Sequence, residues 1–222
     1  MQYTKTRDTK IRDFNNIQTL NILNNVKKNI GFILKRYQPK KRTIAILDSN
    51  MGKIKCVPNK EVFTVGALVK YGIKTNKSPY FLEQIEIIHI PFDTAIQDIL
   101  FFHHILEICY HFIPYHSPTD EAFNLLKYLY LYPDFIQCNN DKKLFLFKLL
   151  TILGLYPEGI QFQTPHFHTL ATTSIDTIIS KNLHLKSERK LDKWLHCCIT
   201  MQPEHSNFKT INFLYKNRLP KL

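Results

Sequence analysis

Short apolar runs broken by turn residues follow one another in the first half of the chain. Five such runs occupy residues 30–37, 42–48, 53–57, 67–74 and 80–90. Runs of this length, bounded by Pro, Gly, Asn or Ser, are typical of β-strands. Ser49-Asn50-Met51-Gly52, between the second and third runs, predicts a hairpin turn in which Gly52 adopts a positive φ at low cost.

Alternation within the strands predicts that the lysines of each strand lie on the face opposite to the apolar residues. In residues 53–57, Ile54 and Cys56 point one way, while Lys53 and Lys55 point the other. In the fourth run, Val69, Tyr71 and Ile73 share a face opposite Lys70 and Lys74. Five strands without a long helical insertion predict a small closed barrel of the OB-fold type, which binds oligonucleotides in many proteins.

The pattern after residue 91 is helical. Asp93 is the expected N-cap of an apolar helix that reaches about Phe112. Ser117 is the expected N-cap of the next helix, with Pro118 at its first position, and that helix ends near Tyr130. A third begins near Asn140 and stops at Gly154. Shorter helices are expected over residues 174–181, 187–200 and 206–215.

These patterns predict an α+β protein, an N-terminal five-stranded OB-fold barrel followed by an all-α helical domain. We expect a basic N-terminal extension at residues 1–28, a nucleic-acid-binding barrel at 29–91 and a helical domain at 92–222. The extension is read either as a marginal helix or as a disordered basic tail.

Positive charge is concentrated in the first part of the chain. Residues 1–91 hold 17 Lys and Arg against 6 Asp and Glu, a net +11, whereas residues 92–222 hold 13 against 12, a net +1. A compositional bias toward Lys, which outnumbers Arg 24 to 6, acts on the whole chain and does not explain this asymmetry. The asymmetry favours a polyanionic partner for the barrel.

Lysines bind phosphates more than they read bases, so weak sequence preference and steep salt dependence are expected. For any single lysine, a solvated barrel exterior is the favoured interpretation, whereas the cluster as a whole favours binding. Tyr37 and Tyr80, at strand ends, are candidates for base stacking, whereas Tyr71 is expected in the core. The candidate DNA-binding residues are Lys35, Arg36, Tyr37, Lys40, Lys41, Arg42, Lys53, Lys55, Lys60, Lys70, Lys74 and Tyr80.

Catalytic and metal-binding patterns are not found in the sequence. Its ten His and five Cys residues have no CxxC or HExxH spacing, so no metal, zinc included, and no other cofactor is expected. The sequence has no P-loop, GxGxxG or GxSxG, and we expect a non-enzyme. The chain shows neither a signal peptide nor a run long enough to span a membrane, and scattered cysteines fit a cytoplasmic, nucleoid-associated protein with no membrane partner.

Four stretches carry a family resemblance through their order and spacing. They are GFILKRYQPKKRTIAILDSNMGKIKCV; GALVKYGIK with YFLEQIEIIHIPFD; ILFFHHILEICYHFIPYHSPTDEAFNLLKYLYLYPD with KKLFLFKLLTILGLYPE; and KWLHCCITMQPEHSNFKTINFL. Together they cover about residues 29–215 and resemble the RecO family of bacterial recombination mediators. Many members carry a cysteine zinc module after the helix that ends here at Gly154, and EGIQFQTPHFHTL has no cysteine in that place.

The resemblance implies a DNA repair factor that binds single- and double-stranded DNA and anneals complementary strands. It also implies partners, namely RecR and the C-terminal tail of single-strand-binding protein, with which such factors help to load recombinase onto coated DNA. Two other hypotheses remain open. One is an RNA-binding or ribosome-associated OB-fold protein, and the other is a metal-dependent enzyme that uses the His-rich helical part.

Overall fold

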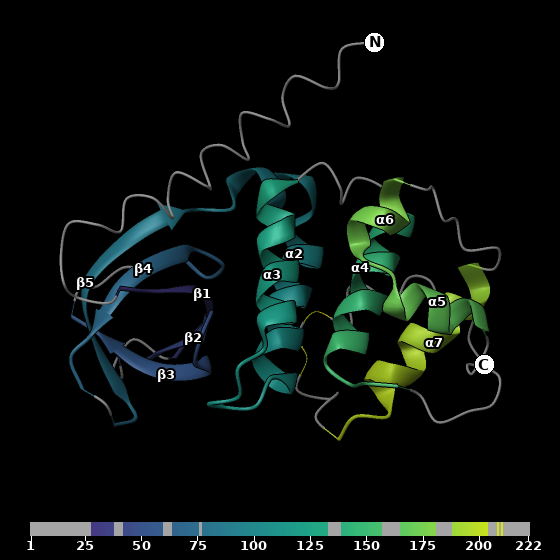
Figure 1. Ribbon diagram of the computed structural model, residues 1–222. Helices are drawn as coiled ribbons and strands as arrows, with labels where there is room; N and C mark the ends of the chain where they lie inside the picture. Colours follow the sequence, from purple (N-terminus) through teal and green to yellow (C-terminus); the bar gives the residue numbers. More distant parts are fainter. Residues whose placement is uncertain are drawn as a thin grey trace, which may run out of the picture.

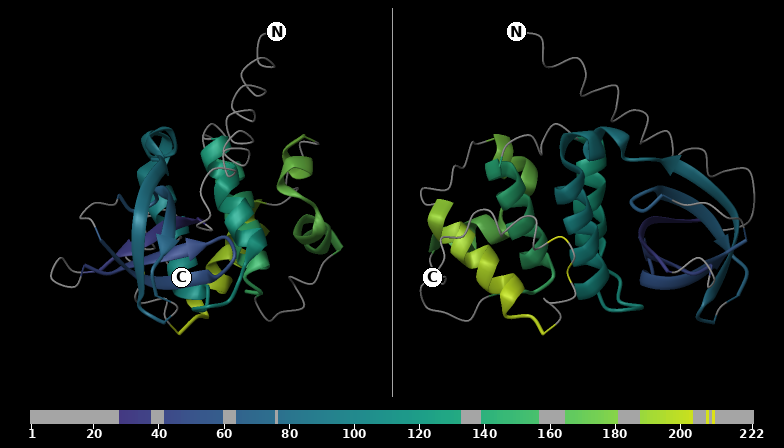
Figure 2. Two further views of the ribbon diagram at one scale, coloured as in Figure 1. Left: turned by 60° about the vertical axis from the view of Figure 1, so that its left-hand side comes forward. Right: turned by 180° about the vertical axis from the view of Figure 1, so that it is seen from behind.

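The computed structural model describes residues 28–37, 42–59, 64–75, 77–132, 139–156, 165–180 and 188–203, together with positions 208 and 210. The predicted extension (except residue 28) and most of the predicted helix at 206–215 lie outside these residues. Figures 1 and 2 show a barrel at one end of the molecule, a layer formed by α2 and α3 beside it, and α4 to α7 beyond that layer.

Five strands close the barrel, as predicted, and their ends lie within two residues of the expected ones. They are β1 (Asn29–Arg36), β2 (Ile44–Asp48), β3 (Gly52–Pro58), β4 (Leu68–Ile73) and β5 (Tyr80–His89). Around the barrel the order is β1-β2-β3-β5-β4, with β4 returning to β1. Only the β3–β5 pairing is parallel.

The barrel interior confirms the predicted alternation of β3 and β4. Its buried residues are Ile33, Ile44, Ile46, Ile54, Cys56, Ala67, Val69, Tyr71 and Leu82. Tyr71 is fully buried, as predicted, and its hydroxyl donates a 2.5 Å hydrogen bond to the Asp48 carboxylate. The other Asp48 oxygen accepts the N–H groups of Asn50 and Met51 at 2.8 Å, which fixes the hairpin turn. Gly52 has φ +71°, also as predicted.

The outer face of β1, β2 and β4 packs against the helices in a second apolar core. The strand residues in this core are Phe32, Leu34, Ala45, Leu47 and Leu68, and they join buried residues of α2, α3, α4 and α7. Burial of these faces is the main stabilising contribution at the junction. The apolar core is therefore continuous across the predicted boundary at residue 91.

Helices follow the barrel in the described part of the chain. They are α2 (Phe92–Phe112), α3 (Asp120–Leu131), α4 (Asn139–Ile152), α5 (Pro165–Thr172), α6 (Ile175–Ser180) and α7 (Glu188–Thr200). The predicted apolar stripe of α7 is confirmed, since Leu191, Trp194, Leu195 and Cys198 are buried. Helix α5 was not predicted, because its eight residues offer too short a pattern to show a helical period.

Two predicted helix starts are wrong. Asp93 is not the N-cap of α2, because Pro91 takes that position. The acid that caps this region is instead Asp98, where the helix has non-helical φ and ψ and the carboxylate accepts the Phe101 N–H at 3.0 Å. Ser117 does not cap α3 either, because Thr119 precedes a helix that begins at Asp120.

The predicted stop at Gly154 is confirmed. Gly154 has φ +72° and donates its N–H to the oxygen of Thr151, while Leu155 donates to the oxygen of Leu150. These two bonds form a Schellman motif, which requires a residue in the left-handed region and so favours glycine. The motif ends α4 and turns the chain away from it.

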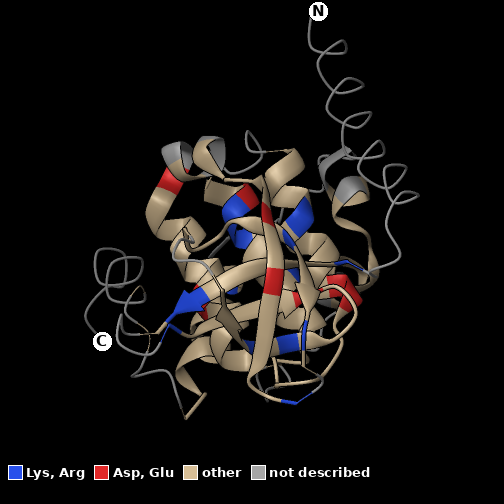
Figure 3. Ribbon diagram, turned by 90° about the vertical axis from the view of Figure 1, so that its left-hand side faces the viewer, with Lys and Arg blue, Asp and Glu red and all other residues tan. Residues whose placement is uncertain are grey.

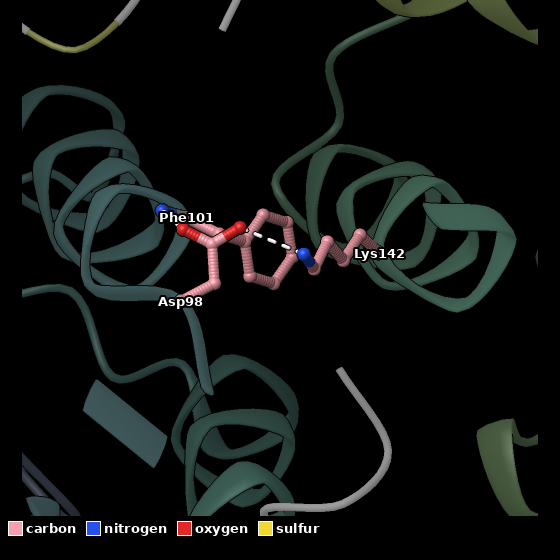
Figure 4. Close-up of polar contacts among 3 residues, drawn as sticks. All are labelled: Asp98, Phe101 and Lys142. Carbon is pink, nitrogen blue, oxygen red and sulfur yellow. Dashed lines mark hydrogen bonds and ion pairs between the residues drawn. The ribbon is translucent and has the colours of Figure 1, made fainter. Parts of the chain in front are cut away.

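Asp98 also joins α2 to α4. Its carboxylate lies 2.7 Å from the Lys142 ammonium, and Phe101 lies beside the pair (Figure 4). Burial alone would raise the pKa of Asp98, but the hydrogen bond and charge of Lys142, together with the Phe101 N–H, outweigh it and hold that pKa below its usual range. The kink in α2 is therefore stabilised by an ion pair from the neighbouring layer.

Candidate functional site

Strand register brings two of the predicted lysines together. Lys35 of β1 pairs with Ala45 of β2, and Ala45 pairs on its other side with Lys55 of β3. Cross-strand neighbours point to the same face of a sheet, so both lysines lie on the outer face with only a small side chain between them. Both lysines are exposed, and neither forms an ion pair within the part of the chain that the structure describes.

Tyrosines from the barrel and from the helical part meet beside these lysines. The Tyr37 hydroxyl lies 2.9 Å from the hydroxyls of both Tyr110 and Tyr115. The Lys35 nitrogen lies 4.1 Å from the Tyr110 ring centroid, and the Lys55 nitrogen lies 5.3 Å from that of Tyr37. These distances are those of cation–π contacts. We call the group the lysine–tyrosine cluster; its members are Lys35, Lys53, Lys55, Tyr37, Tyr110 and Tyr115.

Lys53 belongs to this cluster as a buried member, only 5 % exposed. Its nitrogen donates a 2.5 Å hydrogen bond to the Tyr110 oxygen and lies 4.4 Å from the Tyr115 ring centroid. In a regular helix the Tyr110 oxygen would accept from residue 114, but that residue is Pro114, which has no N–H. Lys53 therefore supplies the missing donor at the end of α2, and its ammonium is held inside the junction.

The connection between α2 and α3 is attached closely to the β2–β3 hairpin. His116 donates its N–H to the Lys53 oxygen at 2.9 Å, and Tyr115 forms a parallel bridge with Lys53. A Cβ on Gly52 would lie 1.9 Å from the Ser117 oxygen, so only glycine allows this approach. The attachment fixes Tyr115 and His116 beside the barrel.

The hydroxyls of Tyr37 and Tyr115 stay protonated. Burial, and then the hydrogen bonds with Tyr110 and Tyr115, raise the pKa of Tyr37 far above its usual range. Burial likewise raises the pKa of Tyr115. Because these two phenols stay neutral, they add no negative charge beside Lys35 and Lys55.

The other predicted residues lie elsewhere. Arg36 and Arg42 are exposed on either side of the connection between β1 and β2, and Arg42 has φ +41°. Lys70 pairs with Ile30 and Glu86, which places it about 17 Å along β1 from Lys35. Figure 3, which looks onto the barrel, shows basic positions on several strands with acidic positions among them.

The remaining predicted residues lie at strand ends or outside the described residues. Lys74 is exposed just past β4, where its N–H bonds the Phe81 oxygen at 2.9 Å. Tyr80 begins β5, and its hydroxyl lies 3.4 Å from the His116 Nδ1. Lys40, Lys41 and Lys60 lie outside the described residues.

Three residues of the site were not among the predicted ones, namely Tyr110, Tyr115 and His116. They come from the end of α2 and from the segment after it, more than thirty positions from their barrel partners in the sequence. The run Cys-Tyr-His-Phe-Ile-Pro-Tyr-His at 109–116 does contain a signal, an unusual density of aromatic residues beside a proline. The sequence alone does not show that this run contacts β3, so it does not reveal which barrel residues these aromatic side chains contact.

Across the ranges that the structure describes, no three His, Cys, Asp or Glu side chains are grouped so as to hold a metal ion. Burial raises the pKa of the Cys56 thiol, and it raises that of Cys109 to about 12, so neither is an activated nucleophile. None of the described helices is both long enough and apolar enough to cross a membrane.

The arrangement can bind a phosphate chain. Two exposed ammonium groups on either side of Ala45 provide charge for phosphates, and neighbouring aromatic rings provide flat surfaces for bases. No protein-family model matches this sequence, and a search of curated proteins finds no match either.

Proposed function

We propose that this chain is a non-enzymatic DNA-binding protein that binds the nucleic-acid backbone at the lysine–tyrosine cluster. The observation that carries the proposal is the convergence of Lys35 and Lys55, both exposed, on the rings of Tyr37 and Tyr110. Cations without carboxylate partners attract phosphates, and release of counterions from the nucleic acid drives binding. The net charge of +11 on residues 1–91 adds long-range attraction of the same sign.

The barrel supports this proposal through its connectivity. A closed five-stranded barrel in the order β1-β2-β3-β5-β4, with a parallel β3–β5 pairing, has the strand order expected of an OB-fold. We infer that the barrel is an OB-fold. Such barrels bind single strands through a basic surface with aromatic side chains, the same two components found in the cluster.

Within DNA-binding proteins, we propose a recombination mediator similar to the RecO family. The sequence resemblance, together with a barrel followed by helices, supports this assignment. The expected activities are annealing of complementary strands and, with RecR, loading of recombinase onto DNA coated by single-strand-binding protein. The C-terminal tail of that coating protein is the proposed partner of the helical part.

The test is a titration of labelled single-stranded DNA, followed by competition with unlabelled DNA and RNA of the same sequence and length. The proposal expects saturable binding, DNA competing at least as well as RNA, and faster annealing of complementary DNA strands. Tighter binding of RNA would favour the second candidate, an RNA-binding barrel, because lysines that contact phosphates do not by themselves distinguish the two polymers. Absence of binding to either polymer would refute both.

A further inference from the structure

One side of the Tyr115 ring is open to solvent, although the residue is anchored at two points. The residue as a whole is 42 % exposed. Lys53, which lies 4.4 Å from the ring centroid, is itself buried, so the ring face that it covers is hidden. The hydroxyl is held by Tyr37 at 2.9 Å. The exposed surface of the ring is therefore the face turned away from Lys53.

The rings of His116 and Tyr80 extend a row of rings that begins at Tyr115. The His116 ring centroid lies 6.3 Å from that of Tyr115 and 5.8 Å from that of Tyr80. His116 is exposed, and its backbone is fixed by the 2.9 Å bond from its N–H to the Lys53 oxygen. We call Tyr80, His116 and Tyr115 the stacking row. The row is held in place before any ligand binds, which lowers the entropic cost of binding.

The stacking row adjoins the exposed lysines. Tyr80 pairs with Cys56 of the neighbouring strand β3 and packs against the barrel interior, so it is the partly buried end of the row. At the other end of the row, Tyr115 shares the hydroxyl network of Tyr37, whose ring lies 5.3 Å from the Lys55 nitrogen. A strand whose phosphates contact Lys35 and Lys55 would thus carry its bases past the exposed rings of Tyr115 and His116.

We propose that the stacking row is a base-stacking subsite, with Tyr115 as its main surface, and that it makes the site selective for unpaired strands. This inference rests on the proposed function, because it assumes that phosphates bind at the lysine–tyrosine cluster. Stacking requires a free base face, which single strands offer and a duplex hides between its base pairs. It does not depend on which base is present, since every base has such a face.

The experiment compares two labelled strands of equal length, oligo(dT) and an oligomer of abasic deoxyribose phosphate. Both carry the same phosphate charges, but only the first can stack. The full chain is expected to bind oligo(dT) about fivefold or more tightly than the abasic strand. The variant Tyr115→Leu should remove most of that difference, because it should weaken binding of oligo(dT) more than binding of the abasic strand.

Two further variants separate stacking from folding. Tyr115→Phe keeps the ring and removes the hydroxyl, so it should retain the preference for oligo(dT). Tyr156→Leu changes a tyrosine that is 57 % exposed beside Trp194 of α7, beyond the α2–α3 layer (Figure 1), and should change neither affinity.

Equal affinity of the unaltered chain for the two strands would overturn the subsite and leave the backbone-binding proposal standing. Loss of the preference in Tyr115→Phe would also overturn it, because the hydroxyl network rather than the ring would then be responsible. Absence of binding to both strands would overturn the proposed function itself, and the subsite with it.

Discussion

The side-chain nitrogen of Lys53 donates a hydrogen bond to the main-chain oxygen of Tyr110, with 2.5 Å between the two atoms. This bond joins β3 to the end of α2 at the point where Pro114 leaves the helix without its usual donor. Lys53 and Lys55 are therefore two positions apart on one face of β3 but have different environments, because one is buried and the other is exposed.

This difference predicts that the two lysines can be separated by mutation. Lys53→Met removes the donor to the partly buried Tyr110 oxygen, and should lower the free energy of unfolding by about 1–3 kcal/mol. Lys55→Met removes an exposed charge and should change stability by less than about 0.5 kcal/mol while weakening DNA binding. Urea unfolding followed by circular dichroism measures the first effect. Equal stabilities of the two variants would contradict the assignment of Lys53 as a structural donor.

A second prediction concerns the attachment of the β2–β3 hairpin to the segment that carries Tyr115. In Gly52→Ala the added Cβ clashes with the Ser117 oxygen, and the residue must also keep an unfavourable positive φ. In Gly154→Ala the residue keeps a similar positive φ, but the added Cβ has no atom within 4 Å. The Gly154 variant should lose about 1–2 kcal/mol from backbone strain alone. The Gly52 variant should lose a further 1 kcal/mol or more, roughly the cost of overpacking.

Thermal and urea unfolding of both glycine variants provide the comparison. Because their φ values are +71° and +72°, the difference between them isolates the contact with Ser117. If Gly52→Ala were no less stable than Gly154→Ala, the hairpin and the α2–α3 connection would not be in the close contact described.

The ion pair between Asp98 and Lys142 should give a pH-dependent contribution to stability. The folded protein holds the pKa of Asp98 below the ordinary value of 3.8, so the pair stabilises the fold above that pH. Its contribution decreases as the pH falls through the lowered pKa and the carboxylate becomes protonated. Lys142→Met should therefore cost up to about 1 kcal/mol at neutral pH, because the pair is partly exposed, and less in acid.

Melting temperatures of the parent chain and of Lys142→Met, compared at neutral pH and below pH 3.8, test this sign. Lys190→Met, at an exposed position of α7, serves as the control for loss of a charge. A stability difference between the parent and Lys142→Met that stays constant with pH would show that Asp98 is not the partner that matters.

The barrel could be predicted from sequence because its determinants are local. Apolar alternation placed Ile54, Cys56 and Tyr71 in the interior, and turn chemistry placed Gly52 at a positive φ. The end of α4 at Gly154 was predictable for the same reason, since a Schellman motif depends on a few consecutive residues. Helix starts were harder to predict, because several residues near each start can act as the N-cap and packing selects among them.

The composition of the site could not be predicted from local patterns. Strand parity put Lys53 on the outer face correctly, but nothing nearby in the sequence shows that α2 covers that position. The pairing of Lys53 with Tyr110 depends on a contact between residues 57 positions apart, and that of Tyr37 with Tyr115 on one 78 apart. Such contacts follow from how the barrel and helices pack, not from periodicity in either.

The central claim is that Lys35 and Lys55 contact phosphates. The measurement is the affinity for single-stranded DNA at several salt concentrations, for the parent chain, for Lys35→Gln with Lys55→Gln, and for a matched control, Lys190→Gln with Lys193→Gln, on exposed positions of α7. Loss of two phosphate contacts should lower the slope of log affinity against log salt by about 1.4, whereas the control should keep the parent slope. If the variant with Lys35→Gln and Lys55→Gln had the same slope and affinity as the parent chain, the claim that these two lysines contact phosphates would be contradicted.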